Sequence, residues 1–366
     1  MTNFIPTFSE KSLRIFTQQI FLAMGVNEKE AKLAVNVLLK ADLRGIDSHG
    51  LARLVGYVRL WEQKRINAQA KIVVDHQTPS TATIDGDGGL GLVVGPQAME
   101  LAIQKAKEVG SGWVAVRNSN HFGIAGFYAM MALEHNMIGI AMTNASPLVA
   151  PTFSSERMLG TNPMAYAFPA GKYSPVVIDM ATSAAANGKL EIAQRKNQEV
   201  PLGWIQQKDG SNTNDPTGIQ HGGSLLPLGS NRDMGSHKGY GLSSVVDILS
   251  AVLSGANYGP WVPPFVSFLE PPSDPVGKGI GHFFGAMRVD AFRPVEEFKS
   301  NMDNWIERFK NAERIDPNQP VIIPGEPETE FEKHRSVHGI PLNELVVKDL
   351  RELGEKFGVR FEPPSY

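Results

Sequence analysis

The stretch DGDGGLGLVVGPQAMELAIQKAKEVG, residues 85–110, places closely spaced glycines between a predicted strand and a predicted helix. Gly89, Gly91 and Gly95 approach the glycine spacing of a dinucleotide-binding turn, but one residue too many separates the last two. The same glycines can instead form a tight strand-to-helix connection, with Pro96 as the first residue of the helix and no bound phosphate. A Rossmann domain also usually begins with this motif, whereas here two predicted helices and a polar cluster come first. We therefore interpret the glycines as structural and keep the phosphate loop as an alternative.

Strand and helix patterns alternate on both sides of this stretch. Period-two and β-rich runs predict strands at residues 71–75, 81–88, 112–119, 138–146, 175–182 and 282–292. Apolar residues at helical spacing predict helices at 9–24, from 27 toward 45, at 96–109, 124–135, 237–255 and 295–310, and two more after residue 328. Residues 201–235 are rich in turn formers and predict irregular loops. The sequence therefore predicts a mixed α/β (α+β) fold.

Composition narrows the class of function. The 366 residues are 42% hydrophobic and 20% charged with a net charge of −3, which favours an ordinary globular enzyme over a nucleic-acid or membrane-surface partner. There is no cysteine, which fits a reducing compartment, and no run of residues resembles a membrane helix or a signal segment. We expect a cytoplasmic protein that acts on a small molecule.

The segment RGIDSHGLARLVGY, residues 44–57, gathers several reactive side chains. If it is helical, His49, Arg53 and Tyr57 recur every four residues and share one face. Histidine can transfer a proton near neutral pH, arginine can hold a carboxylate through two parallel hydrogen bonds, and Ser48 can orient the imidazole. The alternative is an exposed polar helix end, with Asp47 and Ser48 as local caps.

Three further segments carry polar groups at predicted strand ends. His121 lies in RNSNHFGIAGFYA (117–129), Thr161 and Asn162 in LGTNPMAYAFPA (159–170), and Asp179 in VVIDMATSAAANGK (176–189). Ligands often bind at such junctions, although each side chain alone can equally satisfy a turn. The histidines show no paired metal-binding spacing and no G-x-S-x-G motif is present, so we expect neither a metal centre nor a serine hydrolase.

Taken together, these motifs resemble those of a known family. RGIDSHGLARLVGY, GLGLVVGPQAM, VRNSNHFGIAGFYA, GTNPMAYAFP, IDMATS, PLGW, GSHKGYGL and PGEPE resemble, in order and over nearly the whole chain, the malate/L-lactate dehydrogenase family. The family also includes ureidoglycolate, sulfolactate and diketogulonate enzymes and piperideine-2-carboxylate reductases. The resemblance implies hydride transfer between NAD(P)H and a small 2-oxo or 2-hydroxy acid, with reduction of a cyclic imine as an alternative.

The resemblance also implies an architecture. It predicts a non-Rossmann NAD(P)-binding domain with a mostly antiparallel sheet at residues 76–324, including an inserted loop region at about 200–235. Residues 1–75 and 325–366 would form a helical domain for dimerisation and substrate binding. The expected assembly is a homodimer in which the neighbouring subunit helps to close the cleft.

Site residues follow by matching positions. The resemblance assigns proton transfer to His49, oriented by Ser48, with His121 as the competing proton carrier; we favour His49 because it shares the predicted face with the carboxylate partner Arg53. Tyr57 and Thr161 are further expected substrate contacts. The expected cofactor positions, for NAD or NADP, are His121, Phe122, Gly123, Ser146, Thr161, Asn162, Asp179, Met180, Ala181, Lys238, Gly239, Pro324, Gly325 and Glu326.

The substrate itself is left open. Imine reductases of the family have an aspartate that completes a Ser-His relay, whereas this chain has Ala193 near that position and Glu191 close by. Two hypotheses from other classes are a Rossmann-type nucleotide or methyl-donor enzyme that uses residues 89–95 and a non-catalytic protein that binds an acid. Turnover of NADH or NADPH with 2-oxo acids would separate them.

Overall fold

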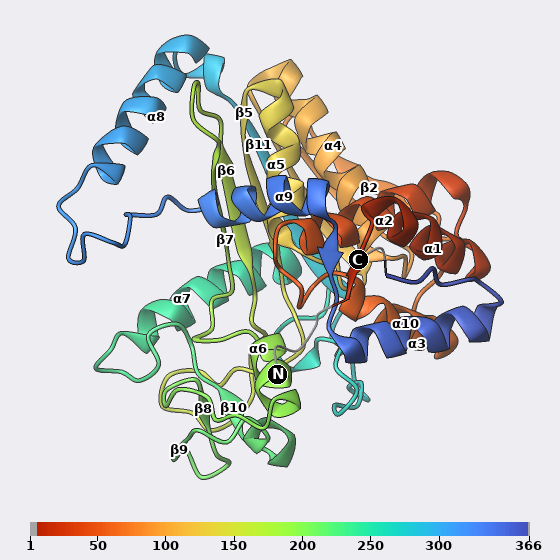
Figure 1. The fold of residues 1–366 in the computed structure, drawn as a ribbon. Coiled ribbons are helices and arrows are strands. Elements are labelled where there is room, and N and C mark those ends of the chain that lie inside the picture. The colour runs from red at the N-terminus through yellow and green to blue at the C-terminus, as the bar shows by residue number, and fades with distance from the viewer. Residues whose placement is uncertain (1–5, 365–366) are drawn as a thin grey trace.

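A mixed seven-stranded sheet runs through the part of the chain that the computed structural model describes, residues 6–364 (Figure 1). In spatial order its strands are β2 (Val73–Gln77), β3 (Thr81–Asp85), β4 (Ser111–Ser119), β11 (Ile280–Arg288), β5 (Met137–Thr143), β6 (Met164–Phe168) and β7 (Val176–Met180). β3 and β4 are parallel, and the other five neighbouring pairs are antiparallel. The predicted mixed α/β class is confirmed.

The central strands are covered on both faces. On β4, Val114 and Val116 pack with α4 (Gly91–Val109) and α5 (Ala125–Met131), whereas Ala115 between them faces the opposite way. That second face packs against α7 (Ser236–Asp247) and the π-helical turn Ile248–Val252. Successive strand side chains point to opposite faces, so burial on both sides produces the apolar run seen in β4.

Helices from the two ends of the chain gather beside the sheet (Figure 1). They are α1 (Glu10–Ala23), α2 (Glu28–Leu43), α3 (Leu54–Glu62), α9 (Glu326–His338) and α10 (Glu344–Phe357). β1 (Thr7–Phe8) pairs with β12 (Ile340–Pro341) and joins the two ends directly. α8 (Val295–Lys310) projects from the opposite side of the molecule.

The region after β7 contains more structure than the sequence predicts. α6 (Asn187–Arg195) follows the edge strand, and the short strands β8 (Ile205–Gln206), β9 (Asn212–Thr213) and β10 (Ser224–Leu225) form a small separate sheet. Its apolar cluster includes Leu190, Ile205 and Leu225. Strands of two residues are too short to show a period, which is why composition alone predicts loops here.

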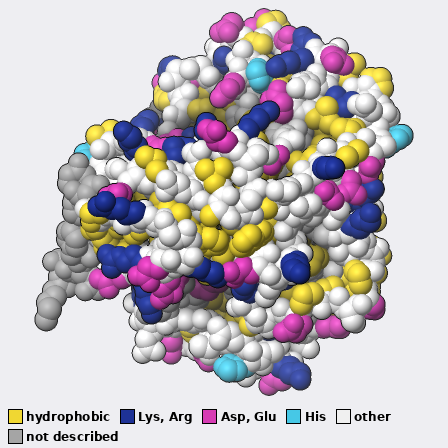
Figure 2. Space-filling view, turned by 90° about the vertical axis from the view of Figure 1, so that its right-hand side faces the viewer, with side chains coloured by type: hydrophobic (Ala, Val, Ile, Leu, Met, Phe, Trp, Pro, Cys, Tyr) yellow, Lys and Arg dark blue, Asp and Glu magenta, His cyan; other side chains and the backbone are white. Residues whose placement is uncertain are grey.

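Charges of both signs intersperse on the face shown in Figure 2. Within residues 6–364, no helix combines the length and the apolar character needed to cross a membrane.

The glycines of residues 85–110 serve close packing. α4 begins at Gly91, not at Pro96 as predicted, and Pro96 lies inside the helix. A Cβ on Gly91 would collide with the backbone carbonyls of Asn120 and His121, and one on Gly95 would lie 2.5 Å from the ring of Tyr128. The helix therefore begins directly against the loop that carries His121.

This packing predicts the effect of one added methyl group. Gly91→Ala should destabilise the protein by about 1–3 kcal/mol, because a backbone clash cannot be relieved by rotating a side chain. Urea denaturation measures the change in the free energy of unfolding. Gly241→Ala is the matched control, since a Cβ on this helical glycine would meet no other atom of the same chain within 4 Å, so its replacement should not destabilise the folded chain itself. Equal effects of the two substitutions would contradict the packing argument.

Candidate active site

The turn that carries Ser48 and His49 is held from below by a buried carboxyl group. Asp42, 1% exposed near the end of α2, accepts a 2.8 Å hydrogen bond from the Leu51 amide. Gly50 lies directly on this carboxyl, where a Cβ would collide with it. Burial raises the pKa of Asp42 to about 8, despite the Leu51 hydrogen bond. Asp42 therefore acts as an internal cap for the segment after the turn.

α9 fixes the same turn from the far end of the chain. The buried guanidinium of Arg335 donates to the Asp42 carbonyl at 2.5 Å and to Asp47 Oδ1 at 2.5 Å. One turn earlier, Glu332 pairs with Lys40 and Arg44 of the α2 end. Residues about 290 positions apart thus define where the turn lies.

The segment is not the continuous helix that would place His49, Arg53 and Tyr57 on one helical face. Residues 47–50 form a turn, a 3-10 helix covers Leu51–Arg53, and α3 begins only at Leu54. Gly50 and the Asp42 contact prevent a continuous helix. The fold nevertheless brings His49, Arg53 and Tyr57 to one place, together with His121 from the loop between β4 and α5.

Two imidazoles stack at this place. The ring centroids of His49 and His121 lie 5.8 Å apart at an interplanar angle of 23°. Ser48 Oγ lies 2.9 Å from His49 Nδ1, and Tyr57 Oη lies 2.6 Å from His121 Nδ1. The ring centroid of Phe265 lies 4.4 Å from that of His121, so Phe265 covers one side of the His121 ring. No local sequence pattern indicates Phe265, because only the tertiary structure brings it here.

Hydrogen bonds define the tautomer of His121. Burial keeps the pKa of Tyr57 well above its usual value, so its hydroxyl stays protonated and is able to donate. The Gly123 amide also donates to Nδ1, at 3.4 Å. A nitrogen that accepts from two donors carries no proton, so the neutral ring has its hydrogen on Nε2. His121 is thus built to donate from Nε2.

Both imidazoles are neutral at pH 7. Loss of hydration, together with a smaller contribution from the nearby Arg53, lowers the pKa of His49 to about 3. The pKa of His121 is lowered for the same reason, with contributions from His49 and Arg53. A neutral His49 can accept a proton.

His282 supports the site from beneath and was not predicted. It is fully buried in β11, with Nδ1 2.7 Å from Thr143 Oγ1 and Nε2 2.8 Å from Ser119 Oγ. Its ring stacks on Phe122 at 4.8 Å between centroids. Burial lowers its pKa to about 3. A single histidine in an apolar strand carries no sequence signal for such a bridge.

Arg53 is held on two sides. Its Nε donates to the Ser48 carbonyl at 2.6 Å, and its two terminal nitrogens face the carboxylate of Glu191 at 3.4 and 3.2 Å. Ala193, at the position discussed for an imine-reductase relay, belongs to the apolar cluster of the small sheet.

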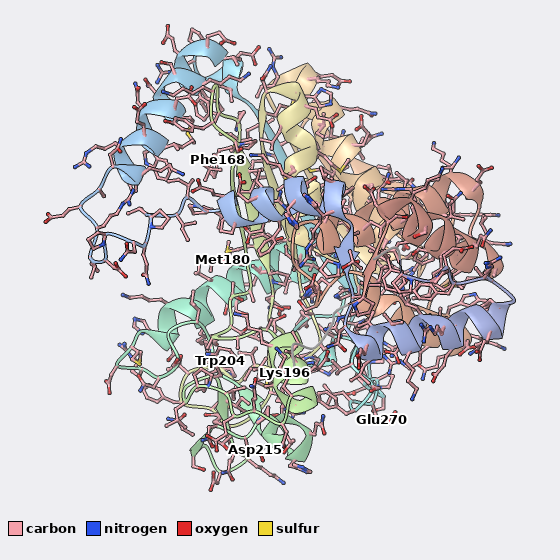
Figure 3. The ribbon with its side chains drawn as sticks, viewed as in Figure 1. Phe168, Met180, Lys196, Trp204, Asp215 and Glu270 are labelled. Atoms are coloured by element: carbon pink, nitrogen blue, oxygen red, sulfur yellow. The ribbon has the colours of Figure 1, made fainter. Side chains whose placement is uncertain are left out.

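Several expected cofactor positions lie along β7. The Pro324 carbonyl accepts from the Val177 amide near the start of the strand, and the Thr161 carbonyl accepts from the Thr182 amide after its end. Gly239 lies against the Leu228 backbone, which in turn bonds to Thr182. These contacts place Pro324 to Glu326 beside the first residues of β7, whereas Thr161 and, through Leu228, Lys238 with Gly239 lie beside Thr182, just after Asp179 to Ala181. Figure 3 marks Met180 in this region.

Asp179 connects this region to the histidine loop. Its carboxylate accepts a 2.7 Å hydrogen bond from the Gly126 amide at the start of α5. The side chain reaches solvent, yet surrounding protein raises its pKa to about 6, opposed by the Gly126 hydrogen bond and by Arg44. The Asp179 carboxylate therefore links β7 to the start of α5, the helix that follows the His121 loop.

Other expected positions have structural partners. Phe122 is buried in the core, Ser146 Oγ accepts from the Phe265 amide, and the Asn162 amide group bonds to the backbones of Ala145 and Ser243. For Phe122, only the backbone is left to contact a ligand. Among residues 6–364, no group of three or more potential metal ligands comes together.

Comparison with known proteins identifies the family of the chain. A family model described as malate/L-lactate dehydrogenase matches residues 8–351. The chain is 45% identical over 346 residues to a malate dehydrogenase of Pyrococcus abyssi, covering 94% of this chain and 93% of the relative. It is 40% identical over 354 residues to an L-sulfolactate dehydrogenase of Methanocaldococcus jannaschii, covering 97% of each. The crystal structure of malate dehydrogenase from Entamoeba histolytica superposes with a TM-score of 0.91 at 35% identity, covering 98% and 99% of the two chains.

These matches define the protein as an oxidoreductase. The chain belongs to the malate/L-lactate dehydrogenase family, and the resemblance inferred from its motifs is confirmed.

The buried Asp42 predicts a dependence of stability on pH. Its folded pKa of about 8 exceeds the ordinary value of 3.8, so between these limits the folded state binds more protons than the unfolded state. Its contribution to stability is therefore full below about pH 4 and is lost as the pH rises toward 8. Asp42→Asn keeps an acceptor for Leu51 and removes the titration.

We expect wild type to lose stability relative to Asp42→Asn as the pH rises, with a limiting slope of about 1.4 kcal/mol per pH unit. Urea unfolding of both proteins at pH 5, 6, 7 and 8 measures this difference. Parallel curves would show that Asp42 is ionised in the folded protein at all four pH values.

Proposed function

We propose that the protein transfers a hydride between NADH or NADPH and a small 2-oxo or 2-hydroxy acid. The observation that carries the proposal is the stacking of two neutral imidazoles beside Arg53. A proton acceptor, a hydrogen-bond donor and a carboxylate-binding fork are what the interconversion of a hydroxyl and a carbonyl next to a carboxylate requires.

In this proposal Arg53, His121 and His49 have different roles in the reaction. Arg53 holds the substrate carboxylate through its terminal nitrogens. His121, with its hydrogen on Nε2, donates a hydrogen bond to the reacting oxygen. His49 takes the hydroxyl proton during oxidation and returns it during reduction, with Ser48 holding its Nδ1 side. The tautomer of His121 thus favours His49 as the proton carrier on grounds independent of any helical face.

The segments along and just after β7 fit a nicotinamide dinucleotide. Asp179 offers an acceptor for ribose hydroxyls and Lys238 an exposed cation for phosphate, while Gly239 lets the start of α7 pack on the Leu228 backbone. The bound cofactor would supply or accept the hydride. Within the same proposal, Thr161, Met180, Ala181 and the Pro324–Glu326 turn complete the binding surface. Asp179, bonded to Gly126, joins this surface to the histidines.

The domain division expected from the resemblance is part of the proposal. Residues 76–324 would bind the cofactor, while 1–75 and 325–366 supply the turn with His49 and its support from Arg335.

We also propose a homodimer, because Tyr240, Val245, Ile248 and Val252 expose apolar surface along one helical face. Light scattering should give about twice the 39.9 kDa of one chain, and the mass of a single chain would contradict the dimer.

Arg53→Lys tests the carboxylate contact. An ammonium cannot reproduce the planar fork, so kcat/KM for 2-oxo acids should fall by about 10- to 100-fold, the value of one charge-assisted hydrogen bond. Steady-state kinetics with glyoxylate, pyruvate and oxaloacetate, run with both cofactors, measure the loss. Binding of NADH or NADPH by fluorescence should change less than twofold. Unchanged kcat/KM for every acid would make the assignment of Arg53 wrong.

The two histidines are separable by kinetics. His49→Asn should lower kcat for hydroxy-acid oxidation by about 10²- to 10⁴-fold, because the proton acceptor is lost. His121→Asn keeps a donor and should cost much less. Both variants should show wild-type circular dichroism. The reverse ranking would assign proton transfer to His121.

A further inference from the structure

The substrate-binding edge of Arg53 is already occupied by a carboxylate from the protein itself. Both terminal nitrogens face the two oxygens of Glu191, and Nε is bound to the Ser48 carbonyl. A substrate carboxylate that uses the same two nitrogens must displace Glu191. The geometry of this pair therefore matches the geometry expected for substrate.

Glu191 is held in place by its own helix. Asn187 donates to Glu191 Oε1 at 2.8 Å, one helical turn away on α6. Gly188 lies so close to the turn that a Cβ there would be 2.7 Å from Ser48 Cβ and 3.1 Å from Arg53 Nη2. Figure 3 shows Lys196, directly after α6, near the small sheet. α6 thus lies directly over the turn and carries Glu191 to Arg53.

Charge and exposure indicate that this pair is exchangeable. Arg53 is 14% exposed at its side chain, whereas Glu191 is 33% exposed and can regain water when it leaves. If Glu191 stayed, an incoming carboxylate would meet a neutral pair and a like charge within a few ångströms, which weakens its binding. Departure of Glu191 restores a free cation.

We propose that Glu191 is a placeholder for the substrate carboxylate: it orients Arg53 in the free protein and competes with the acid for it. This inference rests on the proposed function, because it assumes that Arg53 binds the substrate carboxylate. It makes Glu191 a residue that sets substrate affinity. The competition lowers the apparent affinity for every acid that needs Arg53 by the same factor, the inverse of the fraction of protein in which Arg53 is free.

The test measures binding of oxamate, a non-reacting 2-oxo acid mimic, by calorimetry with saturating NADH or NADPH. In Glu191→Ala and Glu191→Gln the Kd of oxamate should fall about 5- to 20-fold, and the KM of the best 2-oxo acid should fall in parallel. Glu199→Gln is the matched control: it removes the same charge from an exposed position beyond α6 and should leave Kd within twofold. Two variants at 191 guard against a residual amide contact to Arg53.

The outcomes separate the two proposals. A weaker Kd or no change in both Glu191 variants, with wild type turning over 2-oxo acids, would overturn the placeholder and leave the proposed function intact. A tenfold rise in the Kd of oxamate would overturn the placeholder in the same way and would show that Glu191 serves to position Arg53. Failure of wild type to bind oxamate or to turn over any acid would overturn the proposed function itself.

Discussion

The candidate site depends on one buried hydrogen bond, from the Leu51 amide to the carboxyl group of Asp42. It joins the last turn of α2 to the segment after the turn on which Ser48 and His49 lie. Arg335 reinforces it by joining the Asp42 carbonyl to Asp47. A carboxyl group this far from water is costly to ionise, and its raised pKa reflects that cost. The turn is consequently fixed by both ends of the chain at once.

Burial also determines the chemistry that the histidines can perform. Loss of hydration keeps His49 and His121 neutral, and the two donors on His121 Nδ1 fix its tautomer. Two residues of one type thereby acquire different abilities, one to accept a proton and the other to donate a hydrogen bond. His282 supports this arrangement by joining β4 and β5 through Ser119 and Thr143.

Close backbone packing brings the histidine loop to the turn. Gly91 lets the start of α4 touch the carbonyls of Asn120 and His121, and Gly188 lets α6 touch Ser48. Neither glycine has a positive φ. Both are needed because a Cβ would separate elements that hold reactive groups. The same absence of a side chain at 188 is what allows Glu191 to reach Arg53.

The sequence by itself determined the mixed α/β class, the main helices and strands, the family and the segments that carry His49, Arg53 and His121. Periodicity and local motifs suffice for these because they depend on neighbours in the chain. It did not reveal β6, the true start of α4 or the break in the helical row at Gly50. β6 is defined by its pairing with β5 and β7, and the other two depend on contacts with Asp42, Tyr128 and the loop at 120–121, which lie elsewhere in the sequence. Only the tertiary structure decided that Tyr57 bonds His121, that Phe265 closes the site and that Glu191 occupies Arg53, since hydrogen bonds and burial between distant segments leave no local pattern.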